Sequence, residues 1–219
     1  MQTLNKDKLK ISILNYQMNN LYSINNALVK LNYKTNIISD PQEIKYTDIL
    51  ILPGVGAFGN AMKQLKSLNL IDSLVTFASL NKPLIAICLG MQLLFESSSE
   101  FYHNEGLGIF EGKVRSFNDL SNIKSTPHVG WNDVIINKEN NHQNIGNLKK
   151  KLDSRYYYFV HSFYCDPKNK NEVLTNTKYF DFTFCSSVIK RNIIAFQFHP
   201  EKSGINGLSL IDSFIKEKF

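Results

Sequence analysis

The sequence predicts an α/β fold with three layers, in which helices flank a mostly parallel central sheet. Apolar runs at residues 48–52 and 84–87 are typical of strands that are buried on both faces, and the segment at 9–14 also indicates a buried strand. Segments with helical periodicity lie between these runs, and such alternation favours parallel strands joined by right-handed crossovers. Extended segments dominate the second half, where we expect additional antiparallel pairing.

The first half of the sequence predicts alternating strands and helices. After the strand at 9–14, apolar residues recur on one helical face, namely Leu21, Ile24, Leu28 and Leu31. Asn19 or Asn20 is placed to cap this helix. A short strand is expected near 35–38, and a helical stretch in two pieces near 59–80. The strand at 84–87 leads directly into a helix expected at 89–96.

The second half contains five extended segments with few helices between them: 108–117, 130–136, 156–165, 182–189 and 193–198. An amphipathic helix at 207–219 closes the chain, since apolar residues recur along it at helical spacing. The sequence contains neither an internal repeat nor a linker-like stretch. We therefore expect residues 1–219 to form a single domain.

Composition excludes several classes of protein. The chain has 219 residues, is 43% hydrophobic and carries a net charge of +6. Its apolar runs are far shorter than the ~20 residues of a membrane span, and the N-terminus lacks an apolar signal core. We expect a cytoplasmic protein without a membrane partner. The lysines are scattered except at 149–151, a run that resembles a solvated turn, so no nucleic-acid partner is expected.

The cysteines point away from a disulfide framework or a zinc site. Cys88, Cys165 and Cys185 are an odd number, and they form no C-x-x-C pair. We therefore expect neither a metal nor an organic cofactor. A cysteine of this chain can instead be a buried core residue or a single reactive thiol.

Cys88 is the candidate for that thiol, because it ends the apolar run at 84–87 and precedes a helix-forming segment. Backbone N–H groups at the start of a helix stabilise a thiolate. Ala86 and Gly90 flank Cys88 at two residues on each side, and small residues suit the crowded backbone of a nucleophile elbow. The alternative is an ordinary buried core cysteine.

His199 and Glu201 offer a base and a carboxylate to serve this thiol. Residues two apart in an extended segment point to the same side, and Pro200 stiffens the backbone between them. The imidazole would take a proton from Cys88 while Glu201 fixes its tautomer. Taken alone, the pair is equally compatible with a surface turn.

A glycine-rich loop follows the buried strand at 48–52. Loops at the carboxyl ends of parallel strands converge on one sheet edge, so this loop should lie beside Cys88. We expect backbone amides of Gly54, Val55 and Gly56, together with that of Leu89, to bind an oxyanion. A phosphate-binding loop is the weaker alternative, since the G-x-G-x-x-G spacing and the Walker lysine are missing.

Three segments, at 53–56, 87–95 and 196–204, resemble the class I (triad) glutamine amidotransferases, which have a flavodoxin-like three-layer fold. Further segments at 127–132, 158–164 and 201–208 are similar to the glutaminase subunit (HisH) of imidazole glycerol phosphate synthase. The resemblance runs from about residue 10 to the end of the chain.

The resemblance implies a reaction and a substrate site. Cys88 would attack the side-chain amide of L-glutamine, His199 would protonate the departing ammonia, and water would then release glutamate. Gln92 would face the substrate, as would the backbone of the segment His161, Ser162 and Phe163. Gln92 follows Cys88 by one helical turn, which favours this role over that of a helix-surface glutamine. His128 and the His161 ring are expected to be structural rather than catalytic.

The resemblance also implies a partner. In this family ammonia passes to a cyclase subunit (HisF), a (βα)₈ barrel bound as a heterodimer, which makes imidazole glycerol phosphate and an aminoimidazole carboxamide ribotide (AICAR) in histidine biosynthesis. Val129, Trp131 and Lys202 match positions at that interface. Three alternatives remain: a glutaminase for a sugar-modifying synthase of surface polysaccharide biosynthesis, an inactive docking subunit, and a cysteine peptidase or related hydrolase.

Two departures from the family pattern stand out. Residues 15–21 read Asn-Tyr-Gln-Met-Asn-Asn-Leu, whereas the family usually reads Asp-Tyr-Gly-x-Gly-Asn-Leu. Because two glycines are replaced, we expect this loop to take a less strained backbone path. Ala86 stands where a glycine is usual, and Val129 replaces a common methionine.

Overall fold

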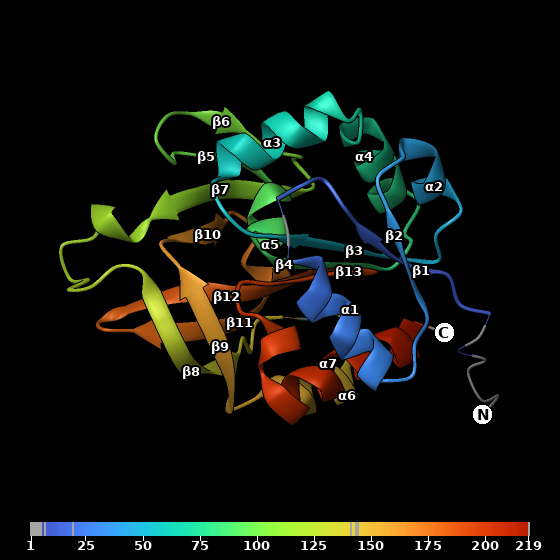
Figure 1. Cartoon of the computed structure of the whole chain (residues 1–219). Helices are drawn as coiled ribbons and strands as arrows, with labels where there is room; N and C mark the ends of the chain where they lie inside the picture. The colour runs from blue at the N-terminus through green and yellow to red at the C-terminus, as the bar shows by residue number, and fades with distance from the viewer. Residues whose placement is uncertain (1–5, 7, 19, 141, 143–144, 219) are drawn as a thin grey trace.

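The computed structural model describes residues 6, 8–18, 20–140, 142 and 145–218. A mixed sheet runs through the centre of the molecule (Figure 1). Its strands lie in the order β2 (Thr35–Ile38), β1 (Ile11–Leu14), β3 (Ile49–Gly54), β4 (Leu84–Cys88), β13 (Ile193–Phe196), β12 (Phe182–Lys190), β10 (Phe163–Pro167), β7 (Phe110–Ser116), β5 (Phe95–Ser98) and β6 (Asn104–Glu105).

The half of the sheet from β2 to β13 is parallel. β1 pairs in parallel with both β2 and β3, and β4 pairs in parallel with both β3 and β13. Every residue of β1, β3, β4 and β13 is buried, which explains their continuous apolar runs. The predicted parallel α/β arrangement is confirmed in this half.

Helices cover both faces of the parallel half (Figure 1). On one face lie α1 (Leu21–Lys30), α6 (Gly146–Leu152) and α7 (Gly204–Lys218), and on the other lie α2 (Pro41–Lys45), α3 (Phe58–Ser67) and α4 (Ile71–Ser79). Side chains alternate along β4, so that Leu84 and Ala86 enter one apolar core while Ile85 and Ile87 enter the other. The predicted three layers are therefore present.

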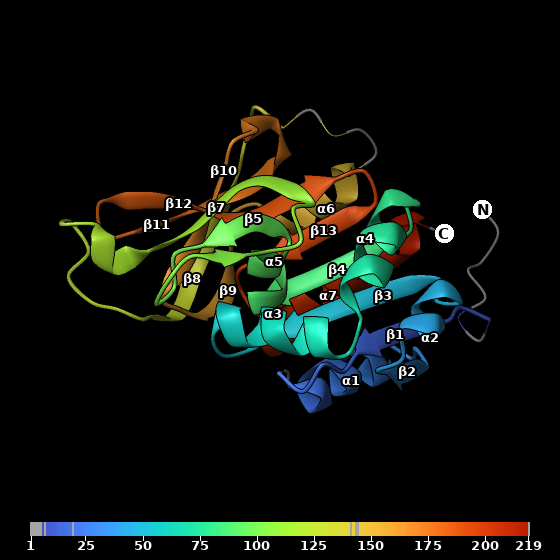
Figure 2. The same cartoon turned by 90° about the horizontal axis from the view of Figure 1, so that it is seen from above.

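The other half is largely antiparallel, as expected. β10 pairs antiparallel with β7 and β12, and β12 pairs antiparallel with β13. β11 (Val173–Tyr179) joins β12 to β8 (His128–Ile136), and β8 pairs with β9 (Arg155–His161) along nearly its whole length. Figure 2 shows these strands extending away from the helices of the parallel half.

Several predicted boundaries are wrong for identifiable reasons. The helix expected at 89–96 is the short α5 (Leu89–Leu93), because residues 95–98 form β5 beside β7. The segment expected as one strand at 156–165 is divided at Ser162 into β9 and β10, which pair with different neighbours. Pairing partners that are distant in sequence override local propensity in both cases.

Other elements were absent from the sequence prediction. The lysine run at 149–151 lies in α6 rather than in a turn, since Leu148 and Leu152 are buried and anchor that helix. α2 begins at a capping box in which Asp40 and Glu43 satisfy backbone N–H groups. Asn20 caps α1 by accepting from the Ser23 amide, as predicted, whereas Asn19 lies outside the described residues.

Candidate active site

Cys88 occupies a strained corner between β4 and α5. Its backbone has φ 54° and ψ −111°, in the left-handed half of φ space that residues other than glycine rarely adopt. A Cβ added at Gly90 would collide with the Leu52 carbonyl, and one at Gly54 would collide with the Tyr16 hydroxyl. The close packing of Leu52 therefore requires the glycine predicted at position 90, on the helix side of Cys88.

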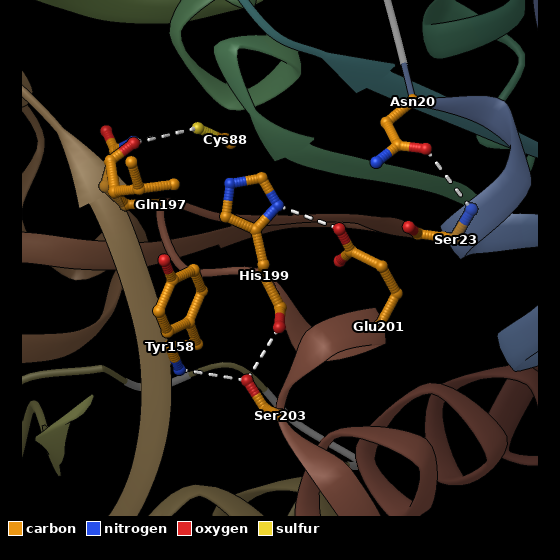
Figure 3. Close-up of polar contacts among 9 residues, drawn as sticks. Asn20, Ser23, Cys88, Tyr158, Gln197, His199, Glu201 and Ser203 are labelled. Carbon is orange, nitrogen blue, oxygen red and sulfur yellow. Dashed lines mark hydrogen bonds and ion pairs between the residues drawn. The ribbon is translucent and has the colours of Figure 1, made fainter. Parts of the chain in front are cut away.

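His199 and Glu201 form the predicted pair. His199 Nδ1 lies 2.8 Å from Glu201 Oε1, and the two side chains are only 4% and 3% exposed. The imidazole lies between Cys88 and Glu201 (Figure 3). Its Nε2 atom is buried without a hydrogen-bond partner among the described residues. One ring nitrogen is thus held by the carboxylate, and the other remains available at the nucleophile.

The electrostatic environment favours a protonated His199. Burial by itself lowers the pKa of His199, but the negative charge of the neighbouring Cys88 acts in the opposite direction. Glu201 adds a hydrogen bond and further negative charge, and the net result raises the pKa of His199 to about 10. At neutral pH the imidazolium can therefore donate a proton to a leaving group.

The loop that carries this pair is fastened to β9. The Ser203 hydroxyl donates to the His199 carbonyl at 2.6 Å and accepts from the Tyr158 amide at 3.0 Å. The His199 amide in turn donates to the Tyr158 carbonyl at 2.8 Å. Figure 3 shows Ser203 between the two segments, so the imidazole has a fixed backbone beneath it.

A cavity of about 370 Å³ opens at Cys88. It brings together most of the residues predicted for the site, which come from four separate segments. The lining consists of Val55, Gly56, Cys88, Leu89, Gln92, Glu100, Pro127, Val160, His161, Ser162, Phe163 and His199. Gly54 does not line the cavity, because it pairs with Cys88 behind the elbow. Glu201 likewise lies behind His199.

The glycine-rich loop packs against residues 15–18. The Tyr16 hydroxyl donates to the Pro53 carbonyl at 2.7 Å, and the Val55 amide donates to the Met18 carbonyl at 2.9 Å. Burial, followed by the charge of Cys88, raises the pKa of Tyr16. The Val55 N–H, expected to face an oxyanion, is therefore engaged by the neighbouring loop.

The expectation of a relaxed path for that loop is wrong. Gln17 has φ 67°, in the left-handed region that glycine adopts without strain. Its amide donates to the Asn15 side chain at 3.1 Å, which is the pattern of an Asx turn. The loop thus keeps a strained conformation although a glycine is replaced.

Two buried imidazoles, those of His128 and His161, lie next to the backbone segment 161–163 that is predicted to face the substrate. His128 Nδ1 and His161 Nε2 lie 3.1 Å apart, and His161 Nδ1 lies 2.8 Å from the Phe163 carbonyl oxygen. Burial lowers the pKa of His128 to about 4 and is the main cause that lowers the pKa of His161 to about 3. Both rings are neutral at neutral pH, unlike His199.

Sequence reasoning missed Glu100 and Gln197. Glu100 is the acidic residue of the cavity lining, and its Oε2 accepts from the Phe58 amide at 2.6 Å at the start of α3. It follows β5, so assigning 89–96 to a helix concealed its position. Gln197 is fully buried and touches both Cys88 and Gln92. Its position two residues before His199 could have identified it as a residue near the site.

The outer face of the β8–β9 ribbon is exposed and apolar. Val129 pairs with Val160, and Trp131 pairs with Tyr158. Val129 and Trp131 are 55% and 56% exposed, and Tyr156 on the same face is 57% exposed. Lys202, in the short 3₁₀ turn η3 (Pro200–Lys202) beside β9, is also exposed. The three residues predicted for a partner interface are thus accessible.

The described residues contain no helix whose length and apolar character would allow it to cross a membrane. They also contain no cluster of three or more His, Cys, Asp or Glu side chains arranged to hold a metal ion.

Comparisons with known proteins agree with this geometry. Residues 12–217 match the family model for glutamine amidotransferase class-I. The chain is 43% identical to "Imidazole glycerol phosphate synthase subunit HisH" of Sulfurimonas denitrificans, with 94% of this chain and 97% of that protein covered. It is 44% identical to "Imidazole glycerol phosphate synthase subunit HisH 2" of Vibrio vulnificus, with 94% of each chain covered.

Solved structures show the same fold at lower identity. "Structure of PurLQS from Thermotoga maritima" superimposes with a TM-score of 0.73 at 17% identity, covering 95% of this chain and 98% of that one. "Crystal structure of glutamine amidotransferase" gives a TM-score of 0.72 at 17% identity, with the same coverage. The chain belongs to the class I glutamine amidotransferases and, within them, to the family of the HisH subunits.

Proposed function

We propose that this chain is the glutaminase subunit of an imidazole glycerol phosphate synthase, and that it releases ammonia from L-glutamine through Cys88, His199 and Glu201. One observation carries the proposal. A buried imidazole lies between a strained cysteine and a carboxylate, with Nδ1 on Glu201 and the unpartnered Nε2 at the nucleophile. This is the arrangement that nucleophilic acyl transfer requires.

The first half of the reaction forms a thioester. The Cys88 sulfur attacks the carbonyl carbon of the glutamine side-chain amide and forms a tetrahedral oxyanion. As the C–N bond breaks, His199 Nε2 transfers its proton to the nitrogen, which leaves as ammonia. The raised pKa of His199 keeps that proton available at neutral pH.

The second half releases glutamate. Neutral His199 accepts a proton from a water molecule as the water attacks the thioester carbon. The C–S bond then breaks, which frees glutamate and restores Cys88 with its imidazolium neighbour. Glu201 stabilises each imidazolium that forms and holds the ring at Nδ1, 2.8 Å away.

The cavity offers separate groups for the two ends of the amino acid. The Gln92 amide donates to the Phe163 carbonyl at 3.2 Å, and both residues share the cavity lining with His161, Ser162 and Glu100. The Glu100 carboxylate is suited to the α-ammonium group of glutamine. Replacing Glu100 with Gln should raise KM more than it lowers kcat, which steady-state glutaminase assays measure. An unchanged KM would remove Glu100 from the binding site.

The oxyanion site is incomplete in this conformation. The Leu89 amide lies at the elbow, but the Val55 amide donates to the Met18 carbonyl at 2.9 Å. We infer that the chain alone hydrolyses glutamine slowly and that a bound synthase turns the loop at 54–56 toward the oxyanion. Glutaminase rates measured with and without the synthase test this inference, and equal rates contradict it.

The relatives favour a particular ammonia acceptor. Two relatives at 43% and 44% identity carry the name of the imidazole glycerol phosphate synthase subunit. We infer a heterodimer with the cyclase barrel HisF, which would receive the ammonia and form imidazole glycerol phosphate and AICAR. The apolar face with Val129 and Trp131, flanked by Lys202, is the surface suited to this partner.

Replacing Cys88 with Ala tests the whole proposal in the assembled complex. Synthesis with glutamine should be lost, while synthesis with added ammonium salt should continue, because the acceptor reaction does not use the thiol. Cys185→Ala is the matched control, since that cysteine is also buried but does not line the cavity at Cys88. Glutamine hydrolysis that persists in Cys88→Ala would refute the assignment. A wild-type complex without glutaminase activity would instead favour an inactive docking subunit.

A further inference from the structure

Gln197 connects the nucleophile to a residue of the cavity wall. It directly follows β13 and is fully buried, with its backbone amide donating to the Ser186 carbonyl at 2.9 Å. Its Nε2 donates to the Cys88 sulfur at 3.7 Å, as Figure 3 shows. Its Oε1 accepts from Gln92 Nε2 at 3.1 Å. One amide therefore contacts both the reacting atom and a side chain of the substrate cavity.

The orientation of both amides is set by the Phe163 carbonyl. A carbonyl oxygen only accepts hydrogen bonds, so the Gln92 atom 3.2 Å from it must be Nε2. Because Gln92 presents the same NH₂ group to Gln197, the Gln197 atom facing it must be the oxygen. The NH₂ group of Gln197 is then the end directed at Cys88. A flipped amide at either residue would place like groups against each other.

We propose that Gln197 is a positioning residue of the glutaminase site, donating to the Cys88 sulfur and holding the Gln92 amide in a single orientation. The proposal rests on the glutaminase function proposed above. When Cys88 is a thiol, its hydrogen has the Val160 carbonyl as an acceptor at 3.9 Å. When Cys88 is a thiolate, the Gln197 N–H is the donor that stabilises it.

This arrangement also determines what Gln92 offers to a ligand. Both hydrogens of Gln92 Nε2 are used, one on the Phe163 carbonyl and one on Gln197. Among the described residues no donor reaches Gln92 Oε1, so this oxygen is the group left for the cavity. Gln92 therefore accepts a hydrogen bond from a donor group of the substrate, such as an N–H, rather than donating to a carboxylate.

Gln197→Met and Gln197→Glu separate this role from packing. Methionine has a similar length but lacks the donor and the acceptor, whereas glutamate keeps an acceptor for Gln92 and places a carboxylate at the sulfur. Site-resolved mass spectrometry of iodoacetamide alkylation measures Cys88 reactivity without any turnover. We expect Cys88 to alkylate about tenfold more slowly in Gln197→Met and about a hundredfold more slowly in Gln197→Glu.

Turnover provides the second readout. In Gln197→Met we expect kcat to fall and KM to rise, because both Cys88 and Gln92 lose their orientation. In Gln92→Met, KM should rise, and Cys88 alkylation should slow less than in Gln197→Met, since Gln197 keeps its N–H donor and loses only the contact that orients its oxygen. Gln64→Met, on α3 and outside the cavity lining, is the matched control for a glutamine-to-methionine change.

The outcomes distinguish this inference from the proposed function. Wild-type alkylation and turnover in a folded Gln197→Met variant, verified by its melting temperature, would overturn the role of Gln197 and leave the glutaminase intact. Slowed alkylation in that variant supports the contact with the sulfur even if the wild-type chain hydrolyses no glutamine. In that case only the proposed function fails.

Discussion

The parallel and antiparallel halves of the sheet contribute different chemistry to one cavity. The parallel half supplies the charged, reactive groups: Cys88 at the end of β4, and His199 with Glu201 just after β13. The antiparallel half supplies the backbone at 161–163, the neutral ring of His161 and, after β5, the Glu100 carboxylate, which takes no part in the proposed proton transfers. Parallel strands end at a common edge, so reactive groups converge there; antiparallel strands instead form a wall and an exposed ribbon.

The pKa values of three buried histidines show the same difference between the halves. His199 is surrounded by Cys88 and Glu201, which raise its pKa to about 10 in spite of burial. His161 and His128 have no carboxylate beside them, and burial is the main cause that lowers their pKa values to about 3 and about 4. Three buried imidazoles of one region thus differ in charge at neutral pH because their neighbours differ, and only His199 can exchange protons with a substrate there.

The largest expected effect comes from exchanging a histidine in each half. His199→Asn should lower glutamine turnover by about 10²- to 10⁴-fold, because it removes the acid and base of both steps. His128→Asn should cost less than about tenfold, since that ring is neutral and does not line the cavity. Steady-state glutaminase assays of the complex compare the two. Equal losses of turnover in the two variants would show that the charged His199 is no more important for the reaction than the neutral His128.

The next effect concerns the exposed ribbon of the antiparallel half. Trp131→Ala should weaken binding of the synthase by about 2 kcal/mol or more, since large aromatic side chains dominate interface energies. Tyr22→Ala is the control, because Tyr22 on α1 is 76% exposed but lies on the parallel half. Isothermal titration with the purified synthase measures both. A larger loss for Tyr22→Ala would move the docking surface to the other half.

A smaller effect is expected in the elbow of the parallel half. Gly90→Ala should destabilise the fold by about 1–3 kcal/mol, because the new methyl group collides with the Leu52 carbonyl. Gly146→Ala is the matched control, since a Cβ there meets nothing within 4 Å. Urea unfolding compares the two variants. If both are as stable as wild type, the elbow is less tightly packed than the structure shows.

The last difference between the halves concerns how the free energy of unfolding depends on pH. The raised pKa of His199 contributes stability that is present below its ordinary value of 6.5 and is lost as pH rises through about 10. The lowered pKa of His128 acts oppositely: its contribution is present above 6.5 and is lost as pH falls through about 4.

Unfolding free energies measured across this range test the signs. The stability advantage of wild type over His199→Asn should shrink between pH 6.5 and about 10. Its advantage over His128→Asn should shrink between pH 6.5 and about 4. ¹⁵N NMR spectra of the imidazoles provide a direct check. We expect both ring nitrogens of His199 to be protonated at pH 7. A neutral His199 at that pH would contradict the proposed difference in charge between His199 and the other two histidines.

Local patterns in the sequence were sufficient to predict the parallel strands, the elbow at Cys88 and the pairing of His199 with Glu201. Each is encoded over a few residues: an apolar run, small residues around a corner, and two side chains separated by one proline. Such local patterns can be recognised without knowing which distant residues pack against them. The class of the second half was also predictable, although its strand limits were not.

Contacts between groups that are distant in the sequence could be identified only from the folded chain. Gln197 contacts Cys88 and Gln92 across 109 and 105 positions of sequence. Glu100 reaches the cavity because residues 95–98 pair with β7 rather than extend a helix. The Val55 amide is engaged by Met18, a contact that no local pattern predicts. Hydrogen bonds and strand pairs between distant segments depend on the packed arrangement of the whole chain, so they become visible only once that arrangement is known.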